Sequence, residues 1–179
     1  MRDLLTLPTF AGDDVFLVVV ESPRGSTFKL KYDPELGAMS ISRPLALGLS
    51  YPNDWGFIPS TKAPDGDPLD ALVLWDVCSF PGVVIPCRAL AVVRVEQNRA
   101  GHPGQRVRND RIVALPDAYR RALPAPATAL TDRVRHELEH FFVAATVFEG
   151  KDPKILGWDG ADAAVALIRD ASRAPVGSP

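Results

Sequence analysis

Val15-Phe16-Leu17-Val18-Val19-Val20 is a β-branched apolar run, short enough for a buried strand, and it ends at Glu21. Residues 27–32 then alternate between apolar and polar, which predicts a second strand. The turn Asp33-Pro34-Glu35-Leu36-Gly37 follows, with a proline that fixes φ and a glycine that tolerates positive φ. Residues 38–42 are the expected returning strand, so the chain should open on a buried strand and a β-hairpin.

Further strands are expected downstream. Apolar runs over 69–74 and 83–95 predict two of them, and Pro86 in the second indicates an edge or a bulge. A shorter strand is predicted over 112–115. The stretch 51–68 is punctuated by proline and glycine and is interpreted as irregular, and 99–111 is interpreted as a basic loop.

The C-terminal part is predicted to be helical. Apolar residues recur every three to four positions from Leu130 to Phe142, and Thr131 or Asp132 is a plausible start. A second helix is expected from about Asp159, with Asp162 favourably placed in its first turn. Strands first and helices last predict an α+β fold with a curved antiparallel sheet or barrel.

Length and composition indicate one globular domain. The 179 residues are 46% apolar and carry a net charge of −2, so no overall field favours nucleic acid or an anionic membrane. No apolar run approaches the roughly 18 residues of a membrane span, and the N-terminus lacks the apolar segment of a secretory signal. We expect a cytoplasmic protein without nucleic-acid or membrane partners. We divide it into an N-terminal arm (1–12), a single domain (13–173) and a flexible tail (174–179).

The two cysteines carry little functional information. Cys78 and Cys87 are interpreted as buried thiols in a reducing compartment, because the sequence shows no export signal that would favour a disulfide. Two cysteines alone do not make a zinc site.

The loop Asp65-Gly66-Asp67-Pro68-Leu69-Asp70 places three carboxylates within six residues. Crowded like charges repel unless a proton or a cation lies between them. Mg²⁺ takes oxygen ligands of this kind, often one or two from the protein, with water or phosphate completing the shell. A solvated acidic turn is the alternative for the loop taken alone. An EF-hand is excluded, because Leu69 and Asp70 stand where it requires an oxygen ligand and a glycine.

Three cations accompany the carboxylates in the predicted strands. Lys29 lies in the second strand, Arg43 ends the third and Arg111 opens the strand after the basic loop. Each one alone would be an ordinary surface charge. Together with the carboxylate loop they indicate a site for a metal-bound polyanion, because Arg and Lys bind phosphate oxygens and carboxylates bind the metal.

In its ordered motifs the chain resembles family I soluble inorganic pyrophosphatases, as a divergent member. The carboxylate loop is preceded by Tyr51-Pro52-Asn53-Asp54-Trp55-Gly56-Phe57-Ile58-Pro59, which resembles the family's Y-P-x-x-Y-G-[FY]-I-P. The resemblance runs from about Val18 to Ala164 and includes His140-Phe141-Phe142. It implies a five-stranded, curved, OB-like antiparallel β-barrel with two C-terminal helices. It also implies hydrolysis of inorganic diphosphate to two phosphates with Mg²⁺, for which Mn²⁺ could substitute.

The resemblance implies a role for each candidate site residue. Asp67 would be the catalytic carboxylate that takes a proton from the attacking water. The implied metal ligands are Asp65, Asp70 and Glu21, with Asn109, or Asp110 if the loop shifts by one, in place of a further family aspartate. The implied substrate-binding residues are Lys29, Arg43, Tyr51, Trp55 and Arg111. Bacterial relatives form hexamers, which implies a homo-oligomer here, with contacts through the helix that carries Phe141 and Phe142. Without such contacts we expect Phe141 and Phe142 to form an exposed apolar patch on a monomer.

The departures from the family pattern have one direction. Lys31 stands in place of a family glutamate, and Asn98-Arg99 in place of a metal-binding Asp-Glu pair. Asn109 replaces an aspartate, and Ala145-Thr146 replaces a Tyr-Lys pair. Carboxylates are lost and cations gained, so the site is predicted to hold fewer metals and to turn over more slowly.

Two alternatives remain at this point. One is a weakened relative that binds phosphate, a nucleotide or a protein partner. The other is an enzyme for a larger diphosphate, with Trp55 stacking on a base, although simple packing of Trp55 is the preferred interpretation. A nucleic-acid role for the basic loop is weaker, because no aromatic residues are interleaved with its arginines.

Overall fold

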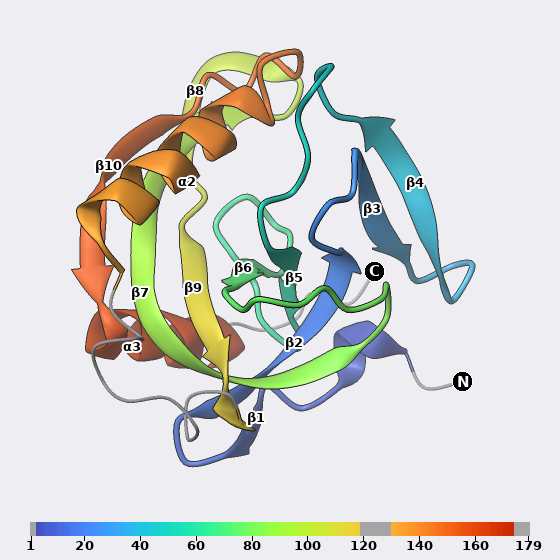
Figure 1. The fold of residues 1–179 in the computed structure, drawn as a ribbon, viewed down its shortest axis with the longest axis vertical. Coiled ribbons are helices and arrows are strands. Elements are labelled where there is room, and N and C mark those ends of the chain that lie inside the picture. The colour runs from blue at the N-terminus through green and yellow to red at the C-terminus, as the bar shows by residue number, and fades with distance from the viewer. Residues whose placement is uncertain (1–2, 119–129, 174–179) are drawn as a thin grey trace.

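The computed structural model describes residues 3–118 and 130–173, and in this part of the chain strands close into a barrel (Figure 1). The barrel order is β2 (Val15–Ser22), β5 (Asp54–Ile58), β6 (Leu69–Val73), β9 (Arg111–Pro116) and β7 (Val84–Arg99), and β7 pairs back onto β2. This confirms the predicted five-stranded OB-like barrel. One pair departs from the antiparallel expectation: β6 and β9 run parallel, which the long connection through β7 allows.

The long strand β7 holds the barrel together. It pairs with β2, β9, β10 (Lys154–Gly160) and β8 (His102–Arg108). Pro86 lies opposite Leu17, before the pairing with β9 begins at Cys87, so its missing N–H falls where β7 has a neighbour on one side only. The bulge itself lies further on, between Ala89 and Ala91.

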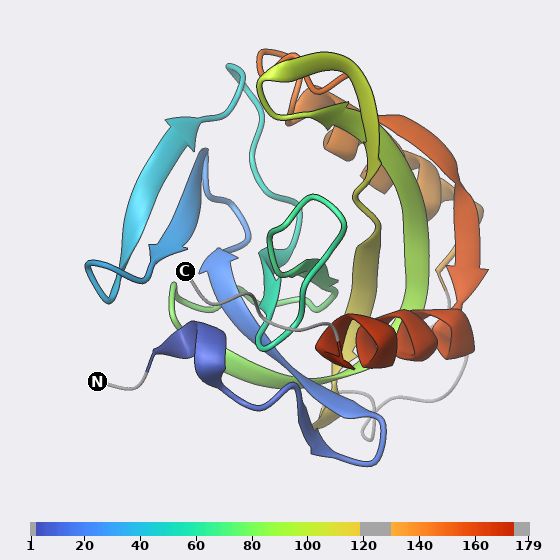
Figure 2. The ribbon, with the colours of Figure 1, turned by 180° about the vertical axis from the view of Figure 1, so that it is seen from behind.

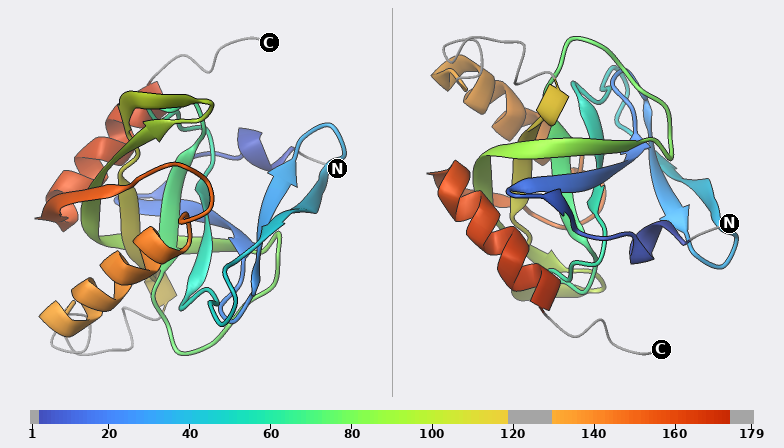
Figure 3. Two further views of the ribbon diagram at one scale, coloured as in Figure 1. Left: turned by 90° about the horizontal axis from the view of Figure 1, so that it is seen from above. Right: turned by 90° about the horizontal axis from the view of Figure 1, so that it is seen from below.

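The predicted hairpin forms a separate two-stranded sheet. β3 (Phe28–Asp33) and β4 (Ala38–Pro44) pair antiparallel, with Gly37 at a φ of 62° in the turn. The hairpin projects from one side of the barrel, whereas α2 and α3 lie on the opposite side (Figure 3). The register places Lys29 opposite Arg43, so the hairpin brings two predicted cations together.

Four strands were not expected from the sequence. β5 and β8 lie in the stretches interpreted as irregular and as a basic loop, and β1 (Phe10–Gly12) and β10 lie in the arm and before the last helix. All five residues of β5 are buried, so the strand shows no alternation. β8 is polar and half-exposed, and β10 is interrupted by a register shift next to Gly157, which has a φ of 135°.

The two helices pack on the barrel (Figure 2). α2 (Asp132–Ala144) begins where predicted, because the Thr131 hydroxyl accepts a hydrogen bond from the Val134 N–H. α3 (Ala161–Arg173) begins two residues after the predicted start at Asp159, because Asp159 and Gly160 still belong to β10. Its buried face, Ala164, Ile168 and Ala171, completes the barrel core. No helix in the described ranges is long and apolar enough to cross a membrane.

The N-terminal residues that the structure describes are attached to the barrel. The short 3₁₀ helix η1 (Leu4–Thr6) is followed by contacts to the segment after β5: Ser60 N donates to Leu5 O at 2.9 Å, and Thr9 Oγ1 donates to Pro59 O at 2.9 Å. The division into arm, domain and tail stays a prediction, and the predicted tail lies outside the described residues.

Two expectations about exposure are wrong. Phe141 and Phe142, which we expected to form an exposed patch on a monomer, are buried within this chain against Tyr51 and Trp55. Cys87 is buried as expected, but Cys78 is exposed because it lies in the turn-rich segment between β6 and β7; both are free thiols.

Candidate active site

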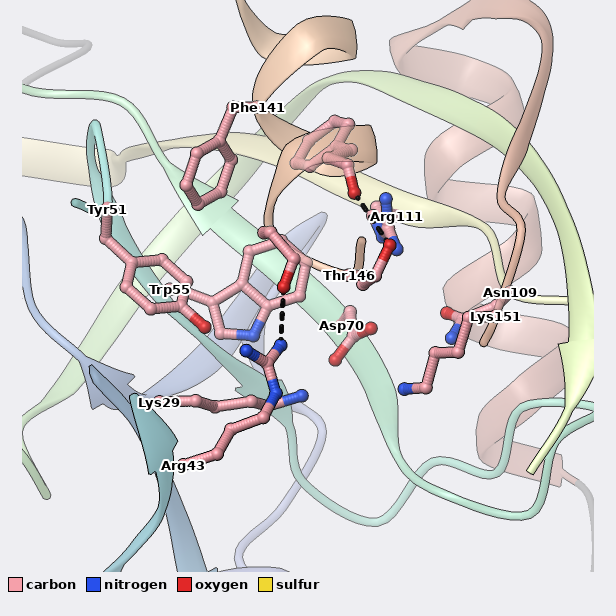
Figure 4. Close-up of a pocket in the computed structure, with 12 residues that line it drawn as sticks. Lys29, Arg43, Tyr51, Trp55, Asp70, Asn109, Arg111, Phe141, Thr146 and Lys151 are labelled. Atoms are coloured by element: carbon pink, nitrogen blue, oxygen red, sulfur yellow. Dashed lines mark hydrogen bonds between the residues drawn. The ribbon is translucent and has the colours of Figure 1, made fainter. Parts of the chain in front are cut away.

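Most of the predicted site residues line two adjoining pockets beside the hairpin, which share Lys29, Asp70, Asn109 and Lys151; we call them the cationic end and the carboxylate end of the site pocket. Figure 4 shows the cationic end. Lys29 on β3 and Arg43 on β4 approach from the hairpin, and Asp70 on β6 and Arg111 on β9 approach from the barrel. Asp70 and Arg111 are register partners in the parallel pair, so strand pairing itself places a carboxylate beside a guanidinium. The barrel therefore fixes half of the site and the hairpin supplies the other half.

Arg111 is a buried cation with unused hydrogen-bond capacity. It is 4% exposed, and its Nε and Nη1 find no hydrogen-bond partner in the described part of the chain. Its guanidinium lies 4.6 Å from the ring centroid of Phe142 and 5.7 Å from that of Trp55. Burial lowers its pKa from the ordinary value, and the charge of Asp70 opposes this. A buried guanidinium with free donors favours an anionic ligand.

The other two predicted cations are partly occupied. Burial lowers the pKa of Lys29; Asp70 opposes this shift and the positive charge of Lys151 adds to it. Arg43 Nη2 donates to Ala145 O at 2.6 Å, and the guanidinium forms an ion pair with Glu149. Lys29, Arg43 and Arg111 nevertheless all border the cationic end of the pocket.

The carboxylate end holds Asp65, Asp67, Asp70 and Glu21. Burial raises the pKa of Glu21 to about 7, and the charge of Asp70 adds to this, although the carboxylate accepts a hydrogen bond from Tyr32 N at 2.9 Å. Burial, then the charges of Asp70 and Asp67, raise the pKa of Asp65 to about 6. These groups repel one another when ionised.

This donor set fits a hard divalent cation. The described ranges contain no group of three or more His, Cys, Asp or Glu side chains already arranged to hold a metal. Mg²⁺ does not need one, since it commonly takes one or two carboxylates and completes its shell with water and phosphate oxygens. Burial, and after it the charges of Asp70 and Asp67, raise the pKa of Asp65, and a bound cation would relieve the repulsion between these carboxylates.

Lys31 also lies at the carboxylate end of the pocket. It stands where the family resemblance places a glutamate. Its Nζ lies 3.2 Å from Asp67 Oδ2. Burial alone would lower the pKa of Lys31, but the carboxylates of Asp67, Glu21 and Asp70 together outweigh burial and raise it. Lys31 therefore neutralises part of the charge that a metal would otherwise meet.

Asp110 does not reach the pocket, so it does not take the place of Asn109. Its carboxylate accepts from Arg94 Nη1 at 2.9 Å, from Arg108 Nη2 at 2.7 Å and from Val95 N at 2.9 Å. Successive residues of an extended chain face opposite sides. Asn109 and Arg111 line the pocket, and Asp110 between them points away from it.

Tyr51 and Trp55 line the pocket wall and pack against aromatic side chains, and their role in binding substrate stays a prediction. Trp55 is 5% exposed, and its ring meets Phe142 edge-on at a centroid distance of 6.0 Å and Tyr51 at 6.2 Å. Burial raises the pKa of the Tyr51 phenol. The ring of Trp55 has no free face for a nucleobase, which agrees with packing rather than stacking on substrate.

Two charged residues of the site were missed from the sequence. Lys151, on the loop between α2 and β10, lines both ends of the pocket, and Glu149 pairs with it at 3.2 Å. No spacing rule pointed to them, because the loop between a helix and an unexpected strand has no periodic pattern. A pocket with carboxylates at one end and cations at the other suits a metal-bound phosphate compound.

Comparisons with known proteins agree with this description. The family model described as inorganic pyrophosphatase matches residues 18–174. The chain is 36% identical over 181 aligned positions to an inorganic pyrophosphatase of Thermus thermophilus, covering 94% of this chain and 95% of that protein. It is 35% identical to one of Methanosarcina acetivorans, covering 86% and 88%.

Solved structures give the same result. The crystal structure of the Thermus thermophilus inorganic pyrophosphatase superposes with a TM-score of 0.83 at 33% identity, covering 96% of this chain and 97% of that one. The Helicobacter pylori inorganic pyrophosphatase gives 0.81 at 29% identity, covering 96% and 99%. The chain belongs to the inorganic pyrophosphatase family.

Divalent metal binding should strengthen as pH rises from about 5 to about 8. Glu21 and Asp65, with pKa values raised to about 7 and about 6, must lose protons before they can bind a cation. Calorimetric titration of Mg²⁺ or Mn²⁺ at several pH values should show tighter binding and proton release at the higher end. Glu21→Gln should reduce the pH dependence, and an affinity independent of pH would contradict the assignment.

The same raised pKa values predict that the stability of the metal-free protein falls as pH rises. A carboxylate whose pKa is higher in the folded state stabilises the fold below its ordinary pKa, and that contribution is lost as pH rises through the folded value. For Glu21 and Asp65 the loss falls between about pH 4 and pH 7, from their ordinary pKa values up to their raised ones. Thermal unfolding should show that added metal offsets this loss.

Proposed function

We propose that this protein hydrolyses inorganic diphosphate to two phosphates, with Mg²⁺ as its cofactor and Mn²⁺ as a substitute. The observation that carries the proposal is the pocket in which Asp65, Asp67 and Asp70 meet Lys29 and Arg111. Family membership supports the reaction, and the donor set supports the metal. A hard, oxygen-liganded cation is the one that crowded aspartates suit best.

Each end of the pocket has its own task in the proposed reaction. Lys29, Arg43 and Arg111 bind phosphate oxygens and hold diphosphate against the carboxylate end. Asp65, Asp70 and Glu21 hold the metal, with Asn109 as a neutral oxygen donor beside them. A divalent cation held there would lower the pKa of coordinated water and offset the charge on phosphate. Asp67, the most exposed of the three loop aspartates, accepts the proton of the attacking water.

The proposed activity is lower than that of a family member with the full set of carboxylates. Lys31, Asn98 and Asn109 remove negative charge from the positions where the resemblance places metal ligands. The alternative of a relative that only binds phosphate, a nucleotide or a protein has no feature in its favour, because the loop aspartates and the cations meet in one pocket. The alternative of a larger diphosphate substrate depended on Trp55 stacking on a base, and the packing of the Trp55 ring against Phe142 does not favour it.

The direct test is phosphate release from diphosphate with Mg²⁺, with Mn²⁺ and without metal. Nucleoside triphosphates and a nucleotide sugar are the comparison substrates. We expect metal-dependent release from diphosphate and little from the others. Release that is absent from diphosphate under every metal condition would sink the proposal.

We also propose a cytoplasmic homo-oligomer, a hexamer by analogy with bacterial relatives. The buried Phe141 and Phe142 do not support it, but exposed apolar side chains follow at the end of α2: Val143, Val147 and Phe148. Phe148 is 86% exposed, an arrangement that favours a protein contact. A sedimentation mass equal to one chain would contradict this.

A further inference from the structure

Ala145 and Thr146, at the end of α2, stand where the resemblance places a Tyr-Lys pair, so this position has no cationic side chain. The Ala145 carbonyl oxygen accepts from Arg43, and the Thr146 hydroxyl donates back to the Phe142 carbonyl oxygen at 3.3 Å (Figure 4). Neither residue has a donor left for a phosphate oxygen. A positive charge at this end of the pocket must come from elsewhere in the chain.

Lys151 supplies that charge. Its side chain borders both the cationic and the carboxylate ends, and its ammonium end is directed into the pocket on the side of Asp70 (Figure 4). Its charge is felt at both ends: it lowers the pKa of Lys29 and also that of Asp65, on which burial has the larger, opposing effect. Lys151 is thus placed between the groups proposed to bind phosphate and those proposed to bind metal.

The backbone around Lys151 is built to hold it there. Gly150 and Asp152 on either side have positive φ values of 65° and 42°, so the chain turns sharply at the lysine. Asn98 on β7 donates two hydrogen bonds to this turn. Its backbone N–H donates to Lys151 O at 2.7 Å, and its side-chain Nδ2 donates to Gly150 O at 3.0 Å.

The orientation of the Asn98 amide is fixed by its other contacts. Its Oδ1 accepts from Arg106 Nη1 at 3.0 Å and from Gly104 N at 3.2 Å, which leaves Nδ2 for Gly150. Arg106 also pairs with Asp152 at 3.2 Å. An aspartate at position 98 would set a carboxylate oxygen against the Gly150 carbonyl oxygen, with no proton between them. Asn98 stands where the family resemblance places a metal-binding aspartate. Its contacts indicate that it positions Lys151 instead.

The position of the Glu149 carboxylate indicates where a negative charge is stabilised near this part of the pocket. Its carboxylate pairs with both Arg43 and Lys151, and its charge raises the pKa of Arg111 against the larger effect of burial. A carboxylate between two cations occupies the kind of space that a phosphate oxygen can take. Phosphate bound there would compete with Glu149 for Arg43 and Lys151.

We propose that Lys151 is a phosphate-binding residue of this active site, held in place by Asn98, and that it supplies from the protein a positive charge close to the metal-binding carboxylates. The proposal rests on the proposed function for its substrate. It changes the meaning of Asn98, because the residue at this position then serves to hold an ammonium group at the pocket rather than marking a simple loss of a metal ligand.

Binding of inorganic phosphate to the metal-free protein tests the proposal without catalysis. Calorimetry should show that Lys151→Ala weakens phosphate binding about tenfold, the scale of one charge-assisted hydrogen bond. Lys154→Ala is the matched control, since it removes the same charge three residues further on, at the start of β10, from a side chain that is exposed and lines neither end of the pocket. Equal phosphate affinity of the Lys151→Ala variant and the wild type would overturn the proposal.

Asn98→Asp tests the positioning role. It should weaken phosphate binding when Lys151 is present and add little in the Lys151→Ala background, because both changes remove the same contact. Equal losses in both backgrounds would show that Asn98 acts by itself. In diphosphate hydrolysis Lys151→Ala should raise KM more than it lowers kcat. If the wild type hydrolyses no diphosphate, the proposed function fails, and the phosphate-binding comparison still decides the role of Lys151.

Discussion

Asp67→Asn should lower the rate of diphosphate hydrolysis at least about a hundredfold while leaving the fold and most of the metal affinity intact. The side chain of Asp67 is 66% exposed, so its replacement by an isosteric amide costs little stability. The amide cannot accept the proton of the attacking water, and proton transfer to a positioned base contributes roughly 10²–10⁴ to a rate. Initial-rate phosphate release at saturating Mg²⁺ measures the loss.

Asp70→Asn is the informative comparison. Asp70 lies between both ends of the pocket and beside Arg111, and its charge acts on Glu21, Asp65 and Lys29. Its replacement should weaken metal binding, so that raising the Mg²⁺ concentration restores part of the rate. The same Mg²⁺ concentrations should not restore the Asp67→Asn variant. Full activity in both variants would show that the carboxylate loop is not the catalytic site.

The sequence predicted the elements that have strong local patterns. The buried run over β2, the alternation and turn of the hairpin, and the capped start of α2 were each confirmed within about two residues. β5 was missed because its five consecutive buried residues show no period and lie within a stretch punctuated by proline and glycine. β8 and β10 were missed because edge strands with polar or irregular faces depend on pairing with β7, which is not visible in local sequence.

The site was predictable where residues lie in motifs and less so where loops bring them in. Strand periodicity alone could have excluded Asp110, since Asn109 and Arg111 share the face opposite to it. Lys151 could not be found in this way, because its place depends on the Asn98 contacts across β7. The burial of Phe141 and Phe142 depends on long-range packing against Tyr51 and Trp55.

The largest expected effect on stability is at Gly56, where β5 passes close to β2. A Cβ at this position would lie 1.9 Å from Val19 O and 2.9 Å from Val20 Cα, both backbone atoms that cannot turn aside. β2 also pairs with β7 to close the barrel, so moving it away from β5 would open the barrel between these two strands. Gly56→Ala should therefore destabilise the protein by more than about 4 kcal/mol, the range of severe core defects.

Thermal unfolding of the metal-free protein measures this effect. For a chain of this length a loss of about 4 kcal/mol corresponds to a fall in Tm of roughly 8–16 °C, and the variant should also accumulate in insoluble form. Gly12→Ala is the control, because its Cβ would meet nothing within 4 Å and its backbone needs no positive φ. That variant should unfold within about 2 °C of the wild type. A Gly56→Ala variant as stable as Gly12→Ala would mean that β2 and β5 can separate at Val19 without opening the barrel, and the close approach of these strands would then not hold the site together.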